Sequence, residues 1–268
     1  MIENTPHEKG GKYLNIENSM VIVSGISGRG CVRKSNEDNI WIHESGEILL
    51  LADGMGGHER GAEASRAAID NFSGQLTPDL IKSQLNEITS ASGISAQYPT
   101  VYTIISRAVS KAANAIYERN NELNLERYMG TTIVGLLIIG GEIFWFHVGD
   151  SRAYRFRDSR LEQLTADHSA YEDWKEAGSV GTAPGKNLIT RAIANNPMVE
   201  ADIEYDEKKS GDIYLLCSDG LTDMVTDEKI EEILNGKNNI PGKADLLFNE
   251  ALSAGGRDNV SIILCKII

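Results

Sequence analysis

Acidic residues stand at the borders of five apolar segments of this 268-residue sequence. Three apolar runs end in an aspartate flanked by glycine, and two acidic groups come just before further apolar runs. The acidic positions are Glu37-Asp38, Asp53, Asp150, Asp219 and Asp258. Because the end of one antiparallel strand lies beside the start of its neighbour, strands that carry these residues would bring them to one edge of the fold.

Such a cluster predicts a site for divalent cations. Aspartate and glycine also favour turns, which would explain any one of these positions but not all five together. Carboxylates within ~5 Å of one another repel strongly, so either some are protonated or cations lie between them. Oxygen ligands favour Mg²⁺ or Mn²⁺ over zinc, and two such ions ~3.5–4 Å apart would clamp a phosphate and lower the pKa of a bridging water. The predicted chemistry is hydrolysis of a phosphate ester.

Two further residues fit this chemistry. Arg33 lies four positions before Glu37, where its guanidinium could hold two phosphate oxygens at once. Gly54 begins the stretch Gly-Met-Gly-Gly, which matches neither the dinucleotide-binding nor the P-loop pattern. We interpret this stretch as a place where the backbone approaches the ions, with the Gly54 carbonyl as a ligand.

Competing hydrolytic chemistries lack the residues that they need. A cysteine-dependent phosphatase requires an arginine six positions after its nucleophile. The sixth residue after Cys31 is Glu37, and the sixth after Cys217 is Asp223. The sequence also contains no G-x-S-x-G motif of the kind that serine hydrolases use.

Composition predicts one catalytic domain in a reducing compartment. The length fits a single layered domain over residues 19–268, preceded by an extension, residues 1–18, that shows no periodicity. A formal net charge of −13 disfavours nucleic acids and anionic membranes as partners. Three cysteines without a C-x-x-C pair, a polar start and the lack of a long apolar run predict a soluble cytoplasmic protein, which we expect to be a monomer.

The apolar runs predict two sheets covered by helices. We expect helices at 59–72, 100–121, 227–234 and 243–254, and strands at 20–24, 39–43, 47–52, 131–139, 142–148, 152–157, 212–217 and 260–267. Gly140-Gly141 predicts a hairpin, which 152–157 would extend as the third strand of a meander. Antiparallel groups of strands separated by blocks of helices indicate an α+β fold. We expect a four-layer αββα sandwich, in which two antiparallel sheets pack face to face with helices on both outer faces.

Several separated motifs resemble the PP2C family of metal-dependent Ser/Thr protein phosphatases, in its compact bacterial form. The resemblance runs from about Ser24 to Ile267 and keeps the order of the family's motifs. These are Arg33-Lys-Ser-Asn-Glu37-Asp38, Asp53-Gly-Met-Gly-Gly, Gly130-Thr-Thr, Gly149-Asp-Ser-Arg, Asp167-His-Ser, Ser218-Asp219-Gly-Leu and Arg257-Asp258-Asn259. The resemblance implies that the protein removes phosphate from phosphoserine and phosphothreonine in proteins, opposing a cognate Ser/Thr protein kinase in bacterial signalling.

The resemblance also implies a ligand set for two Mg²⁺ or Mn²⁺ ions. Asp53 would bridge the two ions. Asp219 and Asp258 would complete the site of one ion, and Glu37 and the Gly54 carbonyl would lie on the other.

Further roles follow from the same resemblance. Asp38 would orient a metal-bound water for attack on phosphorus, and Arg33 would bind the substrate phosphate. Asp150, together with Asp219, would hold a looser third ion.

The sequence departs from some family members at the expected general acid. Those members carry a histidine directly after Asp-Gly, where this chain has Met55. His58 lies three residues further on, and we expect it near a helix start rather than in catalysis. A metal-bound water is then the expected proton source for the leaving serine. His168 belongs to the Asp-His-Ser turn, which precedes either a mobile flap over residues 169–187 or an ordinary surface loop.

Two alternatives to a general phosphatase stay open at this point. One is a catalytically silent relative that acts as a binding module, although every acidic metal position is filled in this chain. The other is a phosphatase dedicated to one regulatory phosphoprotein, which would strongly prefer that protein over generic phosphopeptides.

Overall fold

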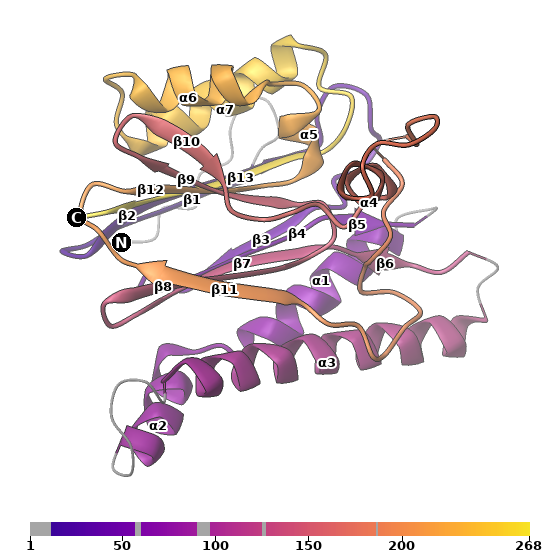
Figure 1. The fold of residues 1–268 in the computed structure, drawn as a ribbon, viewed down its shortest axis with the longest axis horizontal. Coiled ribbons are helices and arrows are strands. Elements are labelled where there is room, and N and C mark those ends of the chain that lie inside the picture. Colours follow the sequence, from indigo (N-terminus) through magenta and orange to yellow (C-terminus); the bar gives the residue numbers. More distant parts are fainter. Residues whose placement is uncertain (1–11, 57–59, 90–96, 125–126, 186) are drawn as a thin grey trace.

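Two antiparallel sheets pack face to face in the computed structural model, which describes residues 12–56, 60–89, 97–124, 127–185 and 187–268 (Figure 1). The six-stranded sheet contains, in spatial order, β1 (Lys12–Glu17), β2 (Val21–Gly28), β13 (Val260–Ile267), β12 (Ile213–Cys217), β9 (Arg152–Arg157) and β10 (Arg160–Gln163). The five-stranded sheet contains β11 (Asp202–Glu207), β8 (Glu142–Val148), β7 (Ile133–Ile139), β4 (Ile48–Ala52) and β3 (Asn39–Ile42). A short pair, β5 (Gly54–Met55) and β6 (Gly130–Thr131), stands beside them.

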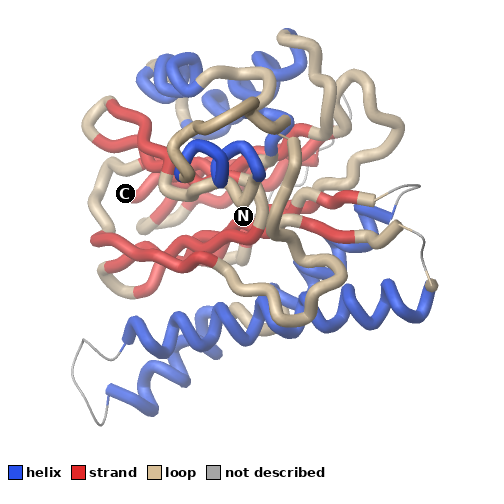
Figure 2. The backbone as a smooth tube through the Cα atoms, turned by 45° about the vertical axis from the view of Figure 1, so that its right-hand side comes forward, coloured by secondary structure: helices blue, strands red, loops and turns tan. Residues whose placement is uncertain are grey.

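Helices cover the outer face of each sheet. One face carries α5 (Asp219–Thr222), α6 (Asp227–Asn235) and α7 (Ile240–Ser253), and the opposite face carries α1 (Arg60–Ser73), α2 (Pro78–Thr89) and α3 (Gln97–Leu123). The short helix α4 (Ala170–Glu176) lies at one end of the sandwich in Figure 1, and Figure 2 shows the molecule with this end turned forward. The predicted α+β, four-layer αββα architecture is therefore confirmed.

The layering explains why the strand sequences are almost wholly apolar. Neighbouring side chains of a strand point to opposite faces. In β4, Leu49 and Leu51 belong to the core between the sheets, whereas Leu50 belongs to the core under α1 and α3. A strand buried on both faces has no polar side, so its sequence is a continuous apolar run.

One predicted connection is wrong. Residues 152–157 do not extend the hairpin of β7 and β8, because β9 pairs with β12 and β10 in the other sheet. The chain changes sheets over residues 149–151. Gly149 has φ +110°, and a Cβ atom at this position would lie 2.6 Å from the Thr132 side chain. Only glycine fits such a turn without strain, and the turn places Asp150 between the two sheets.

Several elements carry weak sequence signals and were not predicted. The strands β10 and β11 lie at sheet edges and have polar sequences, so they lack the apolar alternation that marks a strand. Helices α2 and α4 were also missed, and α4 occupies part of the segment for which we predicted either a flap or a surface loop.

The predicted N-terminal extension is only partly within the described chain. Residues 1–11 lie outside the described residues, and Lys12–Glu17 forms the edge strand β1 against β2. A domain boundary at residue 19 stays a prediction. Among the described helices, none combines the length and apolar character needed to cross a bilayer.

Candidate metal centre

The acidic positions come together where strands of both sheets end. Asp53 follows β4. Because Asn39 of β3 pairs with Ala52 of β4, Asp38 stands opposite Asp53 on the neighbouring strand. Asp219 follows β12, and Asp258 precedes β13. A hydrogen bond joins the two sheets at this point, since the Ser218 hydroxyl donates to Asp38 Oδ2 at 2.9 Å. The structure thus brings the predicted carboxylates to one end of the sandwich.

Asn259 holds the loop that carries the first acidic pair. Its side-chain amide donates to the carbonyls of Arg29 and Ser35 at 3.0 and 2.9 Å, and its Oδ1 accepts from the Glu37 amide at 2.9 Å. Asn259 is buried, so these bonds are shielded from water. This role could not be predicted from the sequence, because the bonded residues are more than two hundred positions apart.

The backbone of Asp53 is held on both sides by two threonines. The Asp53 amide donates to Thr132 Oγ1 at 3.0 Å. The Asp53 carbonyl accepts from Thr131 Oγ1 at 2.8 Å and from the Thr132 amide at 2.9 Å. These bonds explain physically why a Gly-Thr-Thr motif accompanies the Asp-Gly motif.

Glu37 and Gly54 meet against α1. A Cβ atom on Gly61 would lie 2.6 Å from Glu37 Oε2 and 2.6 Å from the Gly54 carbonyl oxygen. Both oxygens therefore lie beside the same small residue, as the predicted pairing of a carboxylate and a carbonyl on one ion requires. Gly61 was not predicted, since a glycine inside a helix gives no sign of what packs against it.

Burial and mutual repulsion raise the pKa values of the central carboxyl groups. Burial raises the pKa of Asp38 to about 6 and, together with the charges of Asp150 and Asp258, that of Asp219 to about 8. Burial also raises the pKa of Asp150 to about 6. The pKa of Asp53 is well above its usual value because of burial and the neighbouring carboxylates, of which Asp38 contributes most. The centre holds more negative charge than its own residues can balance.

Two buried oxygens of this centre have no hydrogen-bond partner among the described residues. They are Oδ1 of Asp38 and Oδ1 of Asp219. A buried carboxylate oxygen without a donor is costly unless a proton or a cation compensates it. The donor set consists of carboxylates and one backbone carbonyl, which suits Mg²⁺ or Mn²⁺. The residues present therefore fit the predicted ions.

Arg33 reaches the same place from the loop before Glu37. Its guanidinium forms an ion pair with Asp258, and its side chain is 52% exposed. The guanidinium is thus held beside the acidic centre and still accessible to a phosphate from solvent.

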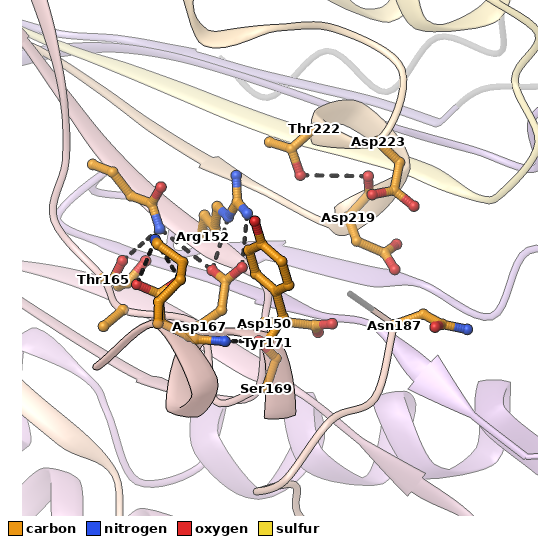
Figure 3. Close-up of a pocket in the computed structure, with 14 residues that line it drawn as sticks. Asp150, Arg152, Thr165, Asp167, Ser169, Tyr171, Asn187, Asp219, Thr222 and Asp223 are labelled. Carbon is orange, nitrogen blue, oxygen red and sulfur yellow. Dashed lines mark hydrogen bonds and ion pairs between the residues drawn. The ribbon is translucent and has the colours of Figure 1, made fainter. Parts of the chain in front are cut away.

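A pocket of about 480 Å³ adjoins the centre on the side of α4 (Figure 3). The carboxylates of Asp150 and Asp219 point into it, and Asp167 forms a two-bond ion pair with Arg152 at 2.8 and 2.7 Å beside them. Helix α4 adds Tyr171 to the lining. The two residues predicted to hold a third ion thus line this pocket.

Three predicted details concern residues beside the centre. His58 lies outside the described residues, so its expected place near a helix start is not described. Met55, at the position of the histidine found in some family members, forms part of β5. His168 is buried beneath the Gly149 turn.

A second group of potential ligands lies next to the acidic centre. In the part of the chain that the structure describes, His147, His168 and Asp202 form the one trio of ligand atoms that all lie within 4.8 Å of one another. No three carboxylates of the acidic centre meet that spacing. The sequence did not indicate this trio, because Asp202 belongs to the unpredicted strand β11.

Comparison with known proteins finds relatives that are similar in sequence and in fold. The family model described as protein phosphatase 2C matches residues 32–253. The serine/threonine phosphatase stp of Listeria monocytogenes is 34% identical over 246 residues, covering 89% of this chain and 92% of that protein. A crystal structure of the PstP catalytic domain in complex with two manganese ions is 33% identical, with a TM-score of 0.75, and the match covers 93% of this chain and 99% of that one. The serine/threonine phosphatase of S. agalactiae has a TM-score of 0.78 at 29% identity, with 92% of this chain and all of that one covered.

Proposed function

The chain belongs to the protein phosphatase 2C family and is a metal-dependent protein serine/threonine phosphatase, and we propose that the acidic centre at the strand ends carries out its reaction. The observation that carries this proposal is the pair of buried oxygens, Asp38 Oδ1 and Asp219 Oδ1, that have no donor among the described residues. Divalent cations would balance the charge that the surrounding residues leave uncompensated.

The proposed ligands divide over two principal ions. Asp53 would be shared by both ions, since it follows β4 and interacts with carboxylates from both sheets. Asp219 and Asp258 would complete one site. Glu37 and the Gly54 carbonyl, which meet beside Gly61, would complete the other.

The remaining residues handle the water and the phosphate. Bound Mg²⁺ or Mn²⁺ supplies Lewis acidity toward the phosphate and lowers the pKa of water. Asp38 has one oxygen fixed by Ser218, so its other oxygen, Oδ1, orients the attacking water. Arg33 holds the phosphate from the open side of the centre with its two-pronged guanidinium.

The reaction is a hydrolysis. The oxygen of water forms a bond to phosphorus, and the bond between phosphorus and the serine or threonine oxygen breaks. The leaving oxygen takes up one proton, so the products are inorganic phosphate and the free hydroxyl side chain. Asp150, together with Asp219, would hold a third ion at the mouth of the pocket.

The substrates are proteins phosphorylated on serine or threonine. Finer predictions remain part of the proposal: a cognate Ser/Thr protein kinase that supplies these substrates, a monomeric enzyme and a cytoplasmic location. Each rests on the sequence, through its charge, its cysteine content and the family resemblance.

Hydrolysis of p-nitrophenyl phosphate and of a phosphothreonine peptide tests the proposal. We expect turnover with Mn²⁺, its loss in EDTA, and a loss greater than about 100-fold in Asp219→Ala, since even indirect supports of a metal site contribute 10–100-fold. Asp70→Ala, on the exposed face of α1, is the matched control and should retain full activity. Full activity of Asp219→Ala, or turnover that survives EDTA, would overturn the proposal.

A further inference from the structure

A single buried residue, His168, bonds both backbone groups of the glycine before Asp150, and on the other side of Asp150 the Ser151 hydroxyl lies 2.7 Å from Thr132 Oγ1. The Gly149 amide donates to His168 Nδ1 at 3.0 Å, and the His168 amide donates to the Gly149 carbonyl at 3.0 Å. Both backbone groups of Gly149 are thus bound by one residue. His168 is 7% exposed, so water does not compete for these bonds.

These contacts fix the tautomer of His168. A backbone amide can only donate, so Nδ1 must accept and the ring proton must lie on Nε2. Burial lowers the pKa of His168, which favours this neutral form. Nε2 faces Asp202 Oδ2 at 3.3 Å, and Asp202 is in turn paired with Arg191. This contact is electrostatic, since Nε2 makes no hydrogen bond among the described residues.

The same tautomer argues against a metal ion in the trio of His147, His168 and Asp202. Nδ1 of His168 is engaged by the Gly149 amide, and Nε2 carries the proton, so neither nitrogen offers a free electron pair. His147 Nε2 lies 2.7 Å from the Ala166 carbonyl, which can only accept, and therefore also carries a proton. The two rings stack with centroids 4.3 Å apart and planes 18° apart, so they lie side by side rather than converging on one point.

We propose that His168 is a positioning residue that fixes the direction of the Asp150 carboxylate through the Gly149 backbone. Asp202 and Arg191 hold the His168 ring in place from β11 and the preceding loop. Asp150 itself is 8% exposed and directly follows the glycine at which the chain changes sheets. The inference rests on the proposed role of Asp150 as a ligand of the third ion.

The position of the contact makes this role specific. Gly149 is also pressed against Thr132, the residue that holds the Asp53 amide. His168 closes the other side of the turn, and its carbonyl accepts from the Thr190 amide at 2.8 Å. Loss of the His168 ring would free the turn on one side only, and would loosen Asp150 without removing the support of Asp53.

Mn²⁺ binding to the full chain, followed by isothermal titration and by electron paramagnetic resonance of free Mn²⁺, tests the inference. We expect wild type to show two tight sites and one weaker site, and Asp150→Ala to lose the weaker one. His168→Ala should weaken that site by about tenfold and leave the tight sites unchanged, as expected for removal of a supporting hydrogen bond. His168→Asn should restore most of the affinity, because its Oδ1 can accept from the Gly149 amide. Asp202→Ala should have a smaller effect in the same direction.

Control variants distinguish a failure of the proposed His168 role from a failure of the proposed Asp150 role. His43→Ala, at the far end of β3, should bind Mn²⁺ as wild type does. If Asp150→Ala abolishes the weak site but His168→Ala and Asp202→Ala do not weaken it, the inference is overturned and the role of Asp150 stands. If Asp150→Ala leaves all sites intact, both the third-ion assignment and the inference fail. Equal weakening of all sites in His168→Ala, without rescue by His168→Asn, would show a structural role only and would also overturn it.

Discussion

The two ends of β12 carry aspartates with buried carboxylate oxygens in opposite electrostatic situations. Asp212, just before the strand, is 2% exposed and accepts from Arg157 Nε and Nη2 at 2.8 and 2.6 Å, and from the Tyr214 hydroxyl at 3.3 Å. Asp219, just after the strand, has no cationic partner, and its Oδ1 has no hydrogen-bond donor among the described residues. The comparison teaches that burial alone does not mark a functional carboxylate. A buried aspartate with an arginine supports the fold, whereas one among other aspartates marks a place for cations.

The largest expected effect on stability is at the Asp212 end of β12, which we call the structural end; the Asp219 end is the functional end. Asp212→Asn would leave the Arg157 guanidinium with only the more exposed Asp206, 3.5 Å away, as a counter-charge, which costs up to about 3–5 kcal/mol. We expect this loss in the free energy of unfolding measured in urea, with phosphatase activity at low denaturant close to that of wild type. A loss of Mn²⁺ affinity in this variant, without a loss of stability, would contradict the claim that Asp212 supports the fold and Asp219 binds cations.

At the functional end, the raised pKa values should make the free energy of unfolding depend on pH. The pKa values of Asp38 and Asp150 are raised to about 6 and that of Asp219 to about 8, compared with about 3.9 in an unfolded chain. The folded protein without divalent ions therefore binds more protons than the unfolded chain, and its free energy of unfolding falls as pH rises from about 4 to about 8. Urea unfolding in EDTA across this window measures the effect.

Two controls sharpen that measurement. Saturating Mn²⁺ should remove the decline, because the ions replace the protons. Asp219→Asn should flatten the EDTA profile at its alkaline end, because a carboxyl group with a pKa raised to about 8 is gone. A stability in EDTA that rises through the window would contradict the account of uncompensated charge.

The smallest effect on stability is expected for the arginine of the functional end. The Arg33–Asp258 pair has side chains 52% and 32% exposed, against 18% and 2% for Arg157–Asp212. Arg33→Ala should therefore cost less than about 1 kcal/mol in unfolding. It should lower kcat/KM by about 10–100-fold, since a hydrogen bond to a charged group contributes about 1.5–3 kcal/mol.

The matching variants define what Arg33 contributes. Arg33→Lys keeps the charge but loses the two-pronged geometry, and its kcat/KM should lie between those of wild type and Arg33→Ala. Arg66→Ala, exposed on α1, should be neutral in both stability and activity. Unchanged kcat/KM in Arg33→Ala would remove this residue from the phosphate site.

The acidic centre could be predicted because its signal is local. Each apolar run is long enough to be recognised as a strand, and each acidic residue stands directly at its border, as in the run that ends at Asp53. Antiparallel pairing then brings the strand ends together with little further information. The two-sheet fold followed from the same runs.

The supports of the centre could not be predicted, because they act across the chain. Asn259 bonds to a loop more than two hundred residues away. Gly61 leaves room for Glu37 and the Gly54 carbonyl, which lie against it. The sheet change at Gly149 has the same local pattern as a hairpin continuation. His168 gains its role from Asp202, whose strand is polar and lies at a sheet edge.

A crystal structure grown with Mn²⁺, with an anomalous difference map recorded for manganese, tests the central claim most directly. The account predicts peaks among Asp53, Asp219 and Asp258 and between Glu37 and the Gly54 carbonyl, with a weaker peak beside Asp150. Manganese bound only at the trio of His147, His168 and Asp202, or no ion shared by the strand-end carboxylates, would contradict it.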